Sequence, residues 1–147
     1  MTTTASAIVQ RIQTVVAAQT GLDAEHVIRG RPASLAEGPT PPVVWIAASR
    51  VTGEYGSDLT SYTYKMFVDI IVVAPATSDS YGDREDASFD LVSTLCAVAD
   101  DTTLLSYLIV PPLVVAEAQL EGLENPGLAV VGLSIECRWL KAIGSGI

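Results

Sequence analysis

The stretch from Ser61 to Val73 constrains the fold more than any other part of this chain, because its residue types alternate along its whole length. One set of alternate positions is apolar throughout: Tyr62, Tyr64, Met66, Val68, Ile70 and Val72. The other set is mixed: Thr63, Lys65, Phe67, Asp69, Ile71 and Val73. Successive side chains of a strand point to opposite faces of a sheet. The pattern therefore predicts a strand, ending at Pro75, with one face under helices and the other facing solvent or a neighbouring subunit.

Other β-rich segments supply partners for this strand. Val43 to Ala48 follows a proline, and the turn-rich stretch Thr52 to Thr60 separates it from the central strand, which predicts a strand, a long hairpin loop and a strand. Leu113 to Leu120 and Leu128 to Leu140 are joined by a segment containing Asn-Pro-Gly, so we expect an antiparallel hairpin. One face of its second strand is apolar: Val131, Leu133, Ile135, Cys137 and Trp139.

Two segments have helical periodicity. The first spans Ser6 to Gln19, with Thr4 or Ser6 as the N-cap and Gly21 as the stop signal. Its apolar stripe consists of Ile8, Ile12, Val15 and Val16. The second spans residues 84–99, preceded by a polar loop at 76–82 and with acidic residues at its start. Asp101 then caps a short segment through residues 102–107.

These elements predict an α+β fold in which a mixed or antiparallel sheet packs against two main helices. The length of 147 residues suits one domain, residues 1–147. Residues 30–42 hold four prolines and form a long loop, the segment DAEHVIRG before them is interpreted as loop as well, and residues 144–147 form a flexible tail.

Composition favours contacts with other protein. Hydrophobic residues make up 49% of the chain and charged residues 17%, whereas a charged share of about 25% is usual. The net charge of −9 disfavours binding to a phosphate backbone. No apolar run approaches the ~20 residues that span a bilayer, and the first residues lack a signal-peptide layout, so we expect no membrane association and a cytoplasmic site of synthesis.

The sequence contains few residues that could form a catalytic, cofactor or metal site. The single histidine, His26, lies in a predicted loop. Because the sequence contains no nucleophile elbow that could act with it, His26 is interpreted as a surface residue. Cys96 and Cys137 are interpreted as small core residues. Helix-dipole matching and solvation explain the acidic cluster, which lacks the spacing of a calcium loop: Asp79, Asp83, Glu85, Asp86 and Asp90. Phosphate-binding glycine motifs are absent. We therefore expect no enzyme activity, cofactor or metal site.

Aromatic residues suggest contacts more than chemistry. Tyr55 lies in the glycine-flanked hairpin loop and either anchors a partner or packs against its own hairpin. Trp45 and Trp139 lie in strands, where they belong to the core, to a sheet face or to a subunit boundary. The sequence leaves these alternatives open.

The order and size of the elements resemble those of the tail terminator, or tail completion, proteins of long-tailed bacteriophages. The segments that carry the resemblance are ASAIVQRIQTVV, YTYKMFVDIIVVAP, DREDASFDLVSTLCAVAD and GLAVVGLSIECRWL. The resemblance implies a virion protein, assembled in the host cytoplasm, of which six copies form a ring. The ring would cap the finished tail tube, end tail elongation and join the tail to a neck or head-completion protein.

By the same resemblance, two loops, Pro32 to Pro42 and Thr52 to Thr60, are the expected contact elements. The candidate contact residues in and beside them are Arg31, Leu35, Glu37, Glu54, Tyr55 and Asp58. Six copies at −9 each would carry −54 charges, so DNA would slide through an acidic channel without binding. The alternatives are another neck or head-completion connector subunit, a cytoplasmic adaptor module, and a small enzyme that uses His26.

Overall fold

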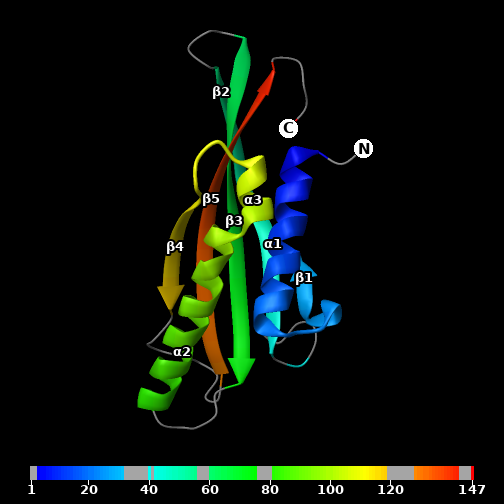
Figure 1. Ribbon diagram of the computed structural model, residues 1–147. Helices are drawn as coiled ribbons and strands as arrows, with labels where there is room; N and C mark the ends of the chain where they lie inside the picture. The colour runs from blue at the N-terminus through cyan, green and yellow to red at the C-terminus, as the bar shows by residue number, and fades with distance from the viewer. Residues whose placement is uncertain are drawn as a thin grey trace.

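The computed structural model describes residues 3–31, 40, 42–55, 60–75, 81–118, 128–142 and 147. These residues form one five-stranded sheet in the order β1-β2-β3-β5-β4 (Figure 1). The strands are β1 (Val27–Arg29), β2 (Val43–Tyr55), β3 (Ser61–Pro75), β4 (Leu113–Ala118) and β5 (Leu128–Ala142). β1 runs parallel to β2, and the other neighbours are antiparallel. The predicted α+β fold with a mixed sheet is confirmed.

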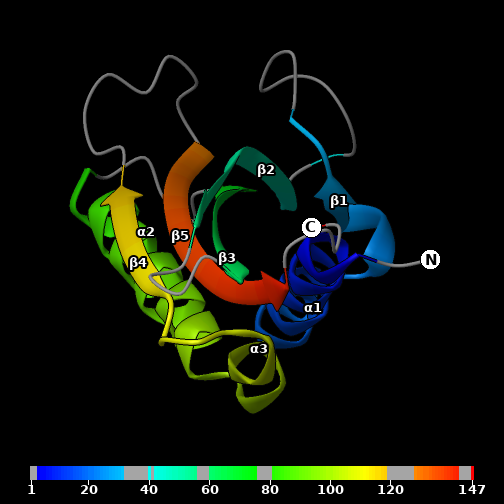
Figure 2. The ribbon, with the colours of Figure 1, turned by 90° about the horizontal axis from the view of Figure 1, so that it is seen from above.

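The described helices cover one face of the curved sheet (Figure 2). They are α1 (Thr4–Thr20), α2 (Tyr81–Cys96) and α3 (Thr102–Tyr107), with the 3-10 turns η1 (Ala24–His26) and η2 (Ala97–Asp100). α1 packs beside β1 and β2, whereas α2 packs beside β4 and β5. No helix in this part of the chain is long and apolar enough to cross a membrane.

Helix ends differ slightly from prediction. The N-cap of α1 is Thr3, not Thr4 or Ser6: its Oγ1 accepts a hydrogen bond from the Ser6 amide at 3.1 Å. Gly21 ends α1 at φ 69°, as predicted, because glycine adopts the left-handed conformation without a Cβ clash. α2 begins at Tyr81, inside the predicted loop 76–82, and gives way to a 3-10 turn after Cys96. The prediction missed the first turn of α2 because that turn is polar and adds nothing to the apolar periodicity.

The loop prediction for DAEHVIRG was wrong, since it contains η1 and β1. β1 is too short to show alternation, and it forms by pairing with residues 44–46 of β2. Gln13 of α1 also donates a hydrogen bond to the Val27 carbonyl at 2.9 Å. At the chain's other end, the Ile147 carbonyl accepts a hydrogen bond from the Ala5 amide at 3.0 Å. Residues 143–146 lie outside the described part of the chain, so the flexible tail stays a prediction.

The predicted hairpin loop 52–60 is shorter than expected, because β2 and β3 pair as far as Tyr55 opposite Tyr62. Gly53, which suggested a turn, lies within this paired region opposite Tyr64. A Cβ at Gly53 would come within 3.0 Å of the Tyr64 ring. The glycine therefore makes room for an aromatic ring on the neighbouring strand, and its turn signal was misleading.

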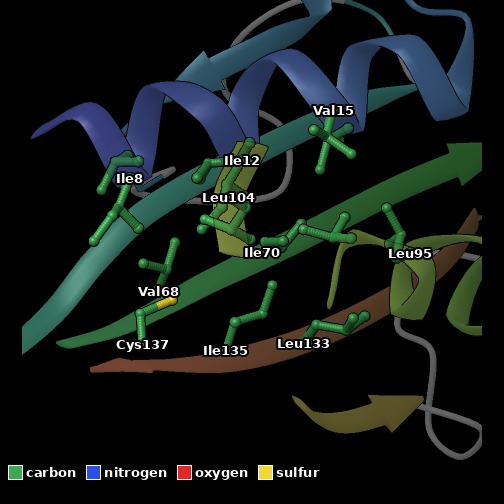
Figure 3. Packing of buried hydrophobic residues seen from close by; sticks show 14 of the residues in the cluster. Ile8, Ile12, Val15, Val68, Ile70, Leu95, Leu104, Leu133, Ile135 and Cys137 are labelled. Atoms are coloured by element: carbon green, nitrogen blue, oxygen red, sulfur yellow. The ribbon is translucent and has the colours of Figure 1, made fainter. Parts of the chain in front are cut away.

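The main core lies between the sheet and the helices (Figure 3). Ile8 and Ile12 of α1 face Val68 and Ile70 of β3, and each is fully buried. The predicted apolar face of β5 is buried in the same cluster. The cysteines are free, and burial raises the pKa of the Cys137 thiol to about 12. The alternation that defined both strands therefore identified the covered face correctly.

An ion pair fastens α3 to α1. Asp101 accepts hydrogen bonds from Nε and Nη2 of Arg11, at 2.8 and 2.9 Å. The same carboxylate accepts the Leu104 amide at 2.8 Å and so caps α3, as predicted. The Arg11 hydrogen bonds are the main reason why the pKa of Asp101 lies below its ordinary value. Arg11 was not predicted to take part, because it lies in a distant helix.

Candidate interaction surfaces

No described helix packs against the side of the sheet opposite α1, α2 and α3, and we call this side the uncovered face (Figure 2). At one end of this face a second apolar cluster is buried: Val43, Trp45, Val73 and Val130, with Ile28 and Ile71 partly buried beside them. Trp45 thus belongs to this cluster, whereas Trp139 belongs to the main core. The sequence had left both positions open.

Next to this cluster the uncovered face forms a hollow of about 250 Å³. The lining residues are Asp69, Ile70, Ile71, Val115, Gly132, Leu133 and Ser134. Gly132 and Ser134 of β5 contribute little side-chain volume here, which leaves space between β3 and β4. Val115 is 59% exposed, and its neighbour Leu113 on the same edge strand is 60% exposed. Large apolar side chains gathered on an edge strand are typical of a contact surface.

Arg31 lies at the rim of this hollow. Its Nη2 donates a hydrogen bond to Oδ2 of Asp69 at 2.5 Å, although the two residues are far apart in the sequence. The turn at Gly30, with φ 135°, carries the chain from β1 toward Arg31, and the Gly30 amide donates to the Ile46 carbonyl at 2.8 Å. The Arg31 side chain remains 52% exposed. Its guanidinium therefore keeps donors for a second carboxylate.

The other end of the uncovered face is charged. A small hollow of about 40 Å³ is lined by Thr52, Glu54, Thr63, Lys65 and Arg138. Arg138 forms an ion pair with Glu136 at 2.6 Å, and the Lys65 ammonium lies 5.8 Å from the centre of the Phe67 ring. These charges are partly neutralised within the chain, and the hollow is too small for a substrate. It offers a polar surface.

A row of aromatic rings runs toward the tip of the β2–β3 hairpin, which extends beyond the helices (Figure 1). The ring centroids of Tyr55 and Tyr62 are 4.4 Å apart, those of Tyr62 and Tyr64 are 5.9 Å apart, and Tyr64 stacks on Trp139 at 5.6 Å. Tyr55 therefore packs against its own hairpin, yet it remains 61% exposed. A hydrogen bond with Tyr55, followed by burial, raises the pKa of Tyr62.

The predicted contact residues fall into two separate surfaces. Arg31 contacts Asp69 of β3, whereas Tyr55 pairs with Tyr62 of β3. Asp69 and Tyr62 are seven residues apart along this strand, which is about 23 Å at roughly 3.3 Å per residue. Glu54 and Tyr55 belong to the end of β2 and not to a loop. The other three candidates, Leu35, Glu37 and Asp58, lie outside the described residues. Sequence reasoning missed Leu113 and Val115, because both sets of alternate positions in the β4 segment begin with apolar residues.

The structure defines the position and the hydrogen bond of His26. It ends η1, is partly buried, and its Nδ1 lies 2.8 Å from the Pro42 carbonyl oxygen. A carbonyl only accepts, so Nδ1 is the protonated nitrogen and His26 connects η1 to the chain before β2. This corrects the interpretation as a surface loop residue. Among the described residues, no three His, Cys, Asp or Glu side chains are grouped closely enough to bind a metal.

No protein-family model matches this sequence, and the curated proteins contain no significant match.

Proposed function

We propose that this chain is the structural subunit of a tail-terminator ring, in which six copies cap a phage tail tube and provide the docking surface for the head. The observation that carries this proposal is the sheet covered by described helices on one side only. Its other side presents a hollow beside two exposed apolar side chains, Leu113 and Val115. Burial of such a surface against another copy is favourable in water. The order of elements, which resembles that of tail terminators, supports the same proposal.

The net negative charge of the chain supports a ring through which DNA passes without binding. The chain has 17 acidic and 8 basic residues. Four of the described basic residues already contact an acid or a ring within the chain: Arg11, Arg31, Lys65 and Arg138. A ring of six would carry −54 charges, so it would not retain a phosphate backbone in its channel. This predicts no measurable affinity of the assembled protein for duplex DNA at physiological salt.

The hairpin tip is the candidate contact with the next ring of the particle. The Tyr55 ring packs against Tyr62 and is exposed, as expected of an aromatic anchor. Tyr55→Asp should reduce joining of heads to tails without changing tail length. Tyr107→Asp, at another exposed tyrosine, is the matched control. Normal yields of complete particles with Tyr55→Asp would contradict this role of the hairpin.

The experiment for the proposed function measures mass and binding together. Light scattering over a dilution series should give six times 15.4 kDa, about 92 kDa, and negative-stain images should contain rings. If the free protein is monomeric, purified tail tubes should still bind it at one end, since a weak interface can close on its template. A stable dimer, or a protein that neither forms rings nor binds tube ends, would contradict the proposal.

A further inference from the structure

The exposed side of α2 carries an aromatic residue between acids. Phe89 is 49% exposed in the middle of the helix, and Asp86 and Asp90 are exposed as well. Residues spaced by three or four positions share a face of a helix, so the ring and the two carboxylates form one projecting group, which we call the α2 knob. Helix packing within the chain does not use it, because Leu91, Val92 and Leu95 make the contacts with the core.

The α2 knob and the hollow are complementary in shape and charge. The hollow has the apolar side chains of Ile71 and Val115 in its lining and the Asp69 carboxylate, which is paired with Arg31, at its edge; its volume of 250 Å³ is enough space for a phenyl ring. Arg31 lies at its rim with more than half of its side chain exposed. A phenylalanine flanked by two carboxylates matches an apolar hollow with a guanidinium beside it.

These two surfaces cannot meet within one molecule. α2 packs against β4 and β5 from the covered side of the sheet (Figure 2). The lining residues Ile71, Ser134 and Val115 alternate with core residues along their strands, so the hollow opens on the uncovered face. The sheet itself therefore separates them. Any contact between the knob and the hollow has to join two copies.

We propose that the hollow of each copy binds the α2 knob of a second copy, with Phe89 inserted between Ile71 and Val115 and with Asp86 and Asp90 beside Arg31. The contact joins two different surfaces, so each copy uses its knob on one neighbour and its hollow on the other. Such a head-to-tail contact generates a ring when its rotation closes, and not a two-fold dimer. This inference rests on the proposed ring function and specifies the subunit contact within it.

The charge balance of the proposed contact depends on Arg31. Two chains of net charge −9 repel each other. On the uncovered face Arg31 is paired with Asp69 and Arg138 with Glu136, and the Arg31 side chain remains 52% exposed. The segment of α2 around the knob contains Asp83, Glu85, Asp86 and Asp90 against a single arginine, Arg84. In the proposed contact Arg31 is the cation that Asp86 and Asp90 approach, and its remaining donors offset part of the repulsion between the copies.

The decisive experiment is disulfide trapping in the full chain. A variant carrying both Phe89→Cys and Val115→Cys, oxidised gently, should give a ladder of covalent oligomers on a non-reducing gel, ending at the hexamer. Phe89→Cys alone and Val115→Cys alone should give no ladder, because neither position faces itself across the contact. Tyr107→Cys combined with Val115→Cys is the matched control for an unrelated exposed aromatic.

A second measurement tests the contact without new thiols. Phe89→Ala should raise the concentration at which half of the protein is assembled by roughly tenfold or more, as expected for an aromatic anchor. Arg31→Ala should also raise it, whereas Arg29→Ala should leave it unchanged. Arg29 is the matched control, because it is an exposed arginine in β1 two residues away.

The outcomes separate this inference from the proposed function. Rings of wild-type protein together with no ladder from the double-cysteine variant, and no effect of Phe89→Ala, would overturn the knob-and-hollow contact and leave the terminator proposal standing. A ladder that ends at a number other than six would support the contact and contradict the hexamer. Absence of rings, of tube binding and of a ladder would overturn both.

Discussion

Asp101 shows how one carboxylate can serve two elements. It caps α3 through the Leu104 amide and holds Arg11 of α1 through two hydrogen bonds. Its side chain is only 15% exposed, so both interactions are partly shielded from water. Two substitutions separate these roles, because asparagine keeps a capping oxygen and loses the charge.

We expect Asp101→Ala to lower the free energy of unfolding more than Asp101→Asn does. Both variants lose the ion pair, and only alanine also loses the cap, so the difference between them should be about 1 kcal/mol. Urea denaturation of the three proteins, followed by circular dichroism, measures this difference. Equal stability of the two variants would mean that the cap contributes nothing to folding.

The pH dependence of this interaction has a defined sign. The pKa of Asp101 is lowered from 3.8 in the folded state, so its charge stabilises the fold above that value. The contribution is lost as the pH falls below 3.8 and through the folded-state pKa. The stability difference between wild type and Asp101→Asn should therefore shrink from pH 7 to pH 3. A difference that stays constant over this range would exclude a charged Asp101 as its source.

Cys137 should be chemically silent in the folded protein. The thiolate is the reactive form, and burial raises the pKa of this thiol to about 12. We expect iodoacetamide at pH 8 to leave Cys137 unmodified until the chain is unfolded, as measured by peptide mass spectrometry. Cys96, which is partly buried on α2, serves as the internal reference. Rapid native labelling of Cys137 would show that the core opens on this timescale.

At the scale of elements, α1 and the strands β3 and β5 depend on one another for burial. Ile12 of α1 is fully buried in the core cluster with Ile70 of β3 and Ile135 of β5 (Figure 3). A helix of this length has little stability alone, so its apolar stripe and the sheet are stable only together. The exposed Gln10 on the same helix makes no comparable contribution.

Ile12→Ala should lower the free energy of unfolding by roughly 2–5 kcal/mol, the usual cost of removing a large buried side chain. Gln10→Ala, on the exposed side of α1, should change it by less than about 0.5 kcal/mol. Both values come from denaturant titrations of the monomeric protein, so that assembly does not contribute. A cost below 1 kcal/mol for Ile12→Ala would contradict the position of α1 in the core.

At the scale of the whole molecule, the main core lies on one face of the sheet and the proposed subunit contact lies on the other. The covered face contains the main core, whereas the hollow and the exposed residues of β4 contribute little to folding of a single chain. The two properties should therefore be separable by substitution. Val115, at 59% exposure beside the hollow, is the residue that tests this separation.

Val115→Asp should leave the midpoint of unfolding of the monomer nearly unchanged and abolish the ring mass in light scattering. Val110→Asp is the control, because Val110 is also exposed but does not line the hollow. If Val115→Asp and Val110→Asp both retain the ring, the uncovered face is not a subunit contact. Loss of folding in Val115→Asp would instead show that β4 depends on this side chain.

The sequence by itself determined the four longer strands and the covered face. The alternation along β3 and β5, the stop at Gly21 and the cap at Asp101 are local signals, because they depend on period, on a left-handed glycine and on one side-chain oxygen. These signals need no knowledge of distant residues. They were sufficient for the fold class and for most of the buried residues.

Only the tertiary structure decided where the candidate interaction surfaces lie. β1 exists because α1 and β2 hold three residues in place, and Arg31 reaches Asp69 across 38 positions of sequence. Arg11 and Asp101 are 90 positions apart. The hollow forms because strand register brings Gly132 and Ser134 of β5 between β3 and the exposed edge strand β4. Such features depend on which distant segments become neighbours in the fold, and local residue patterns do not indicate which segments these are.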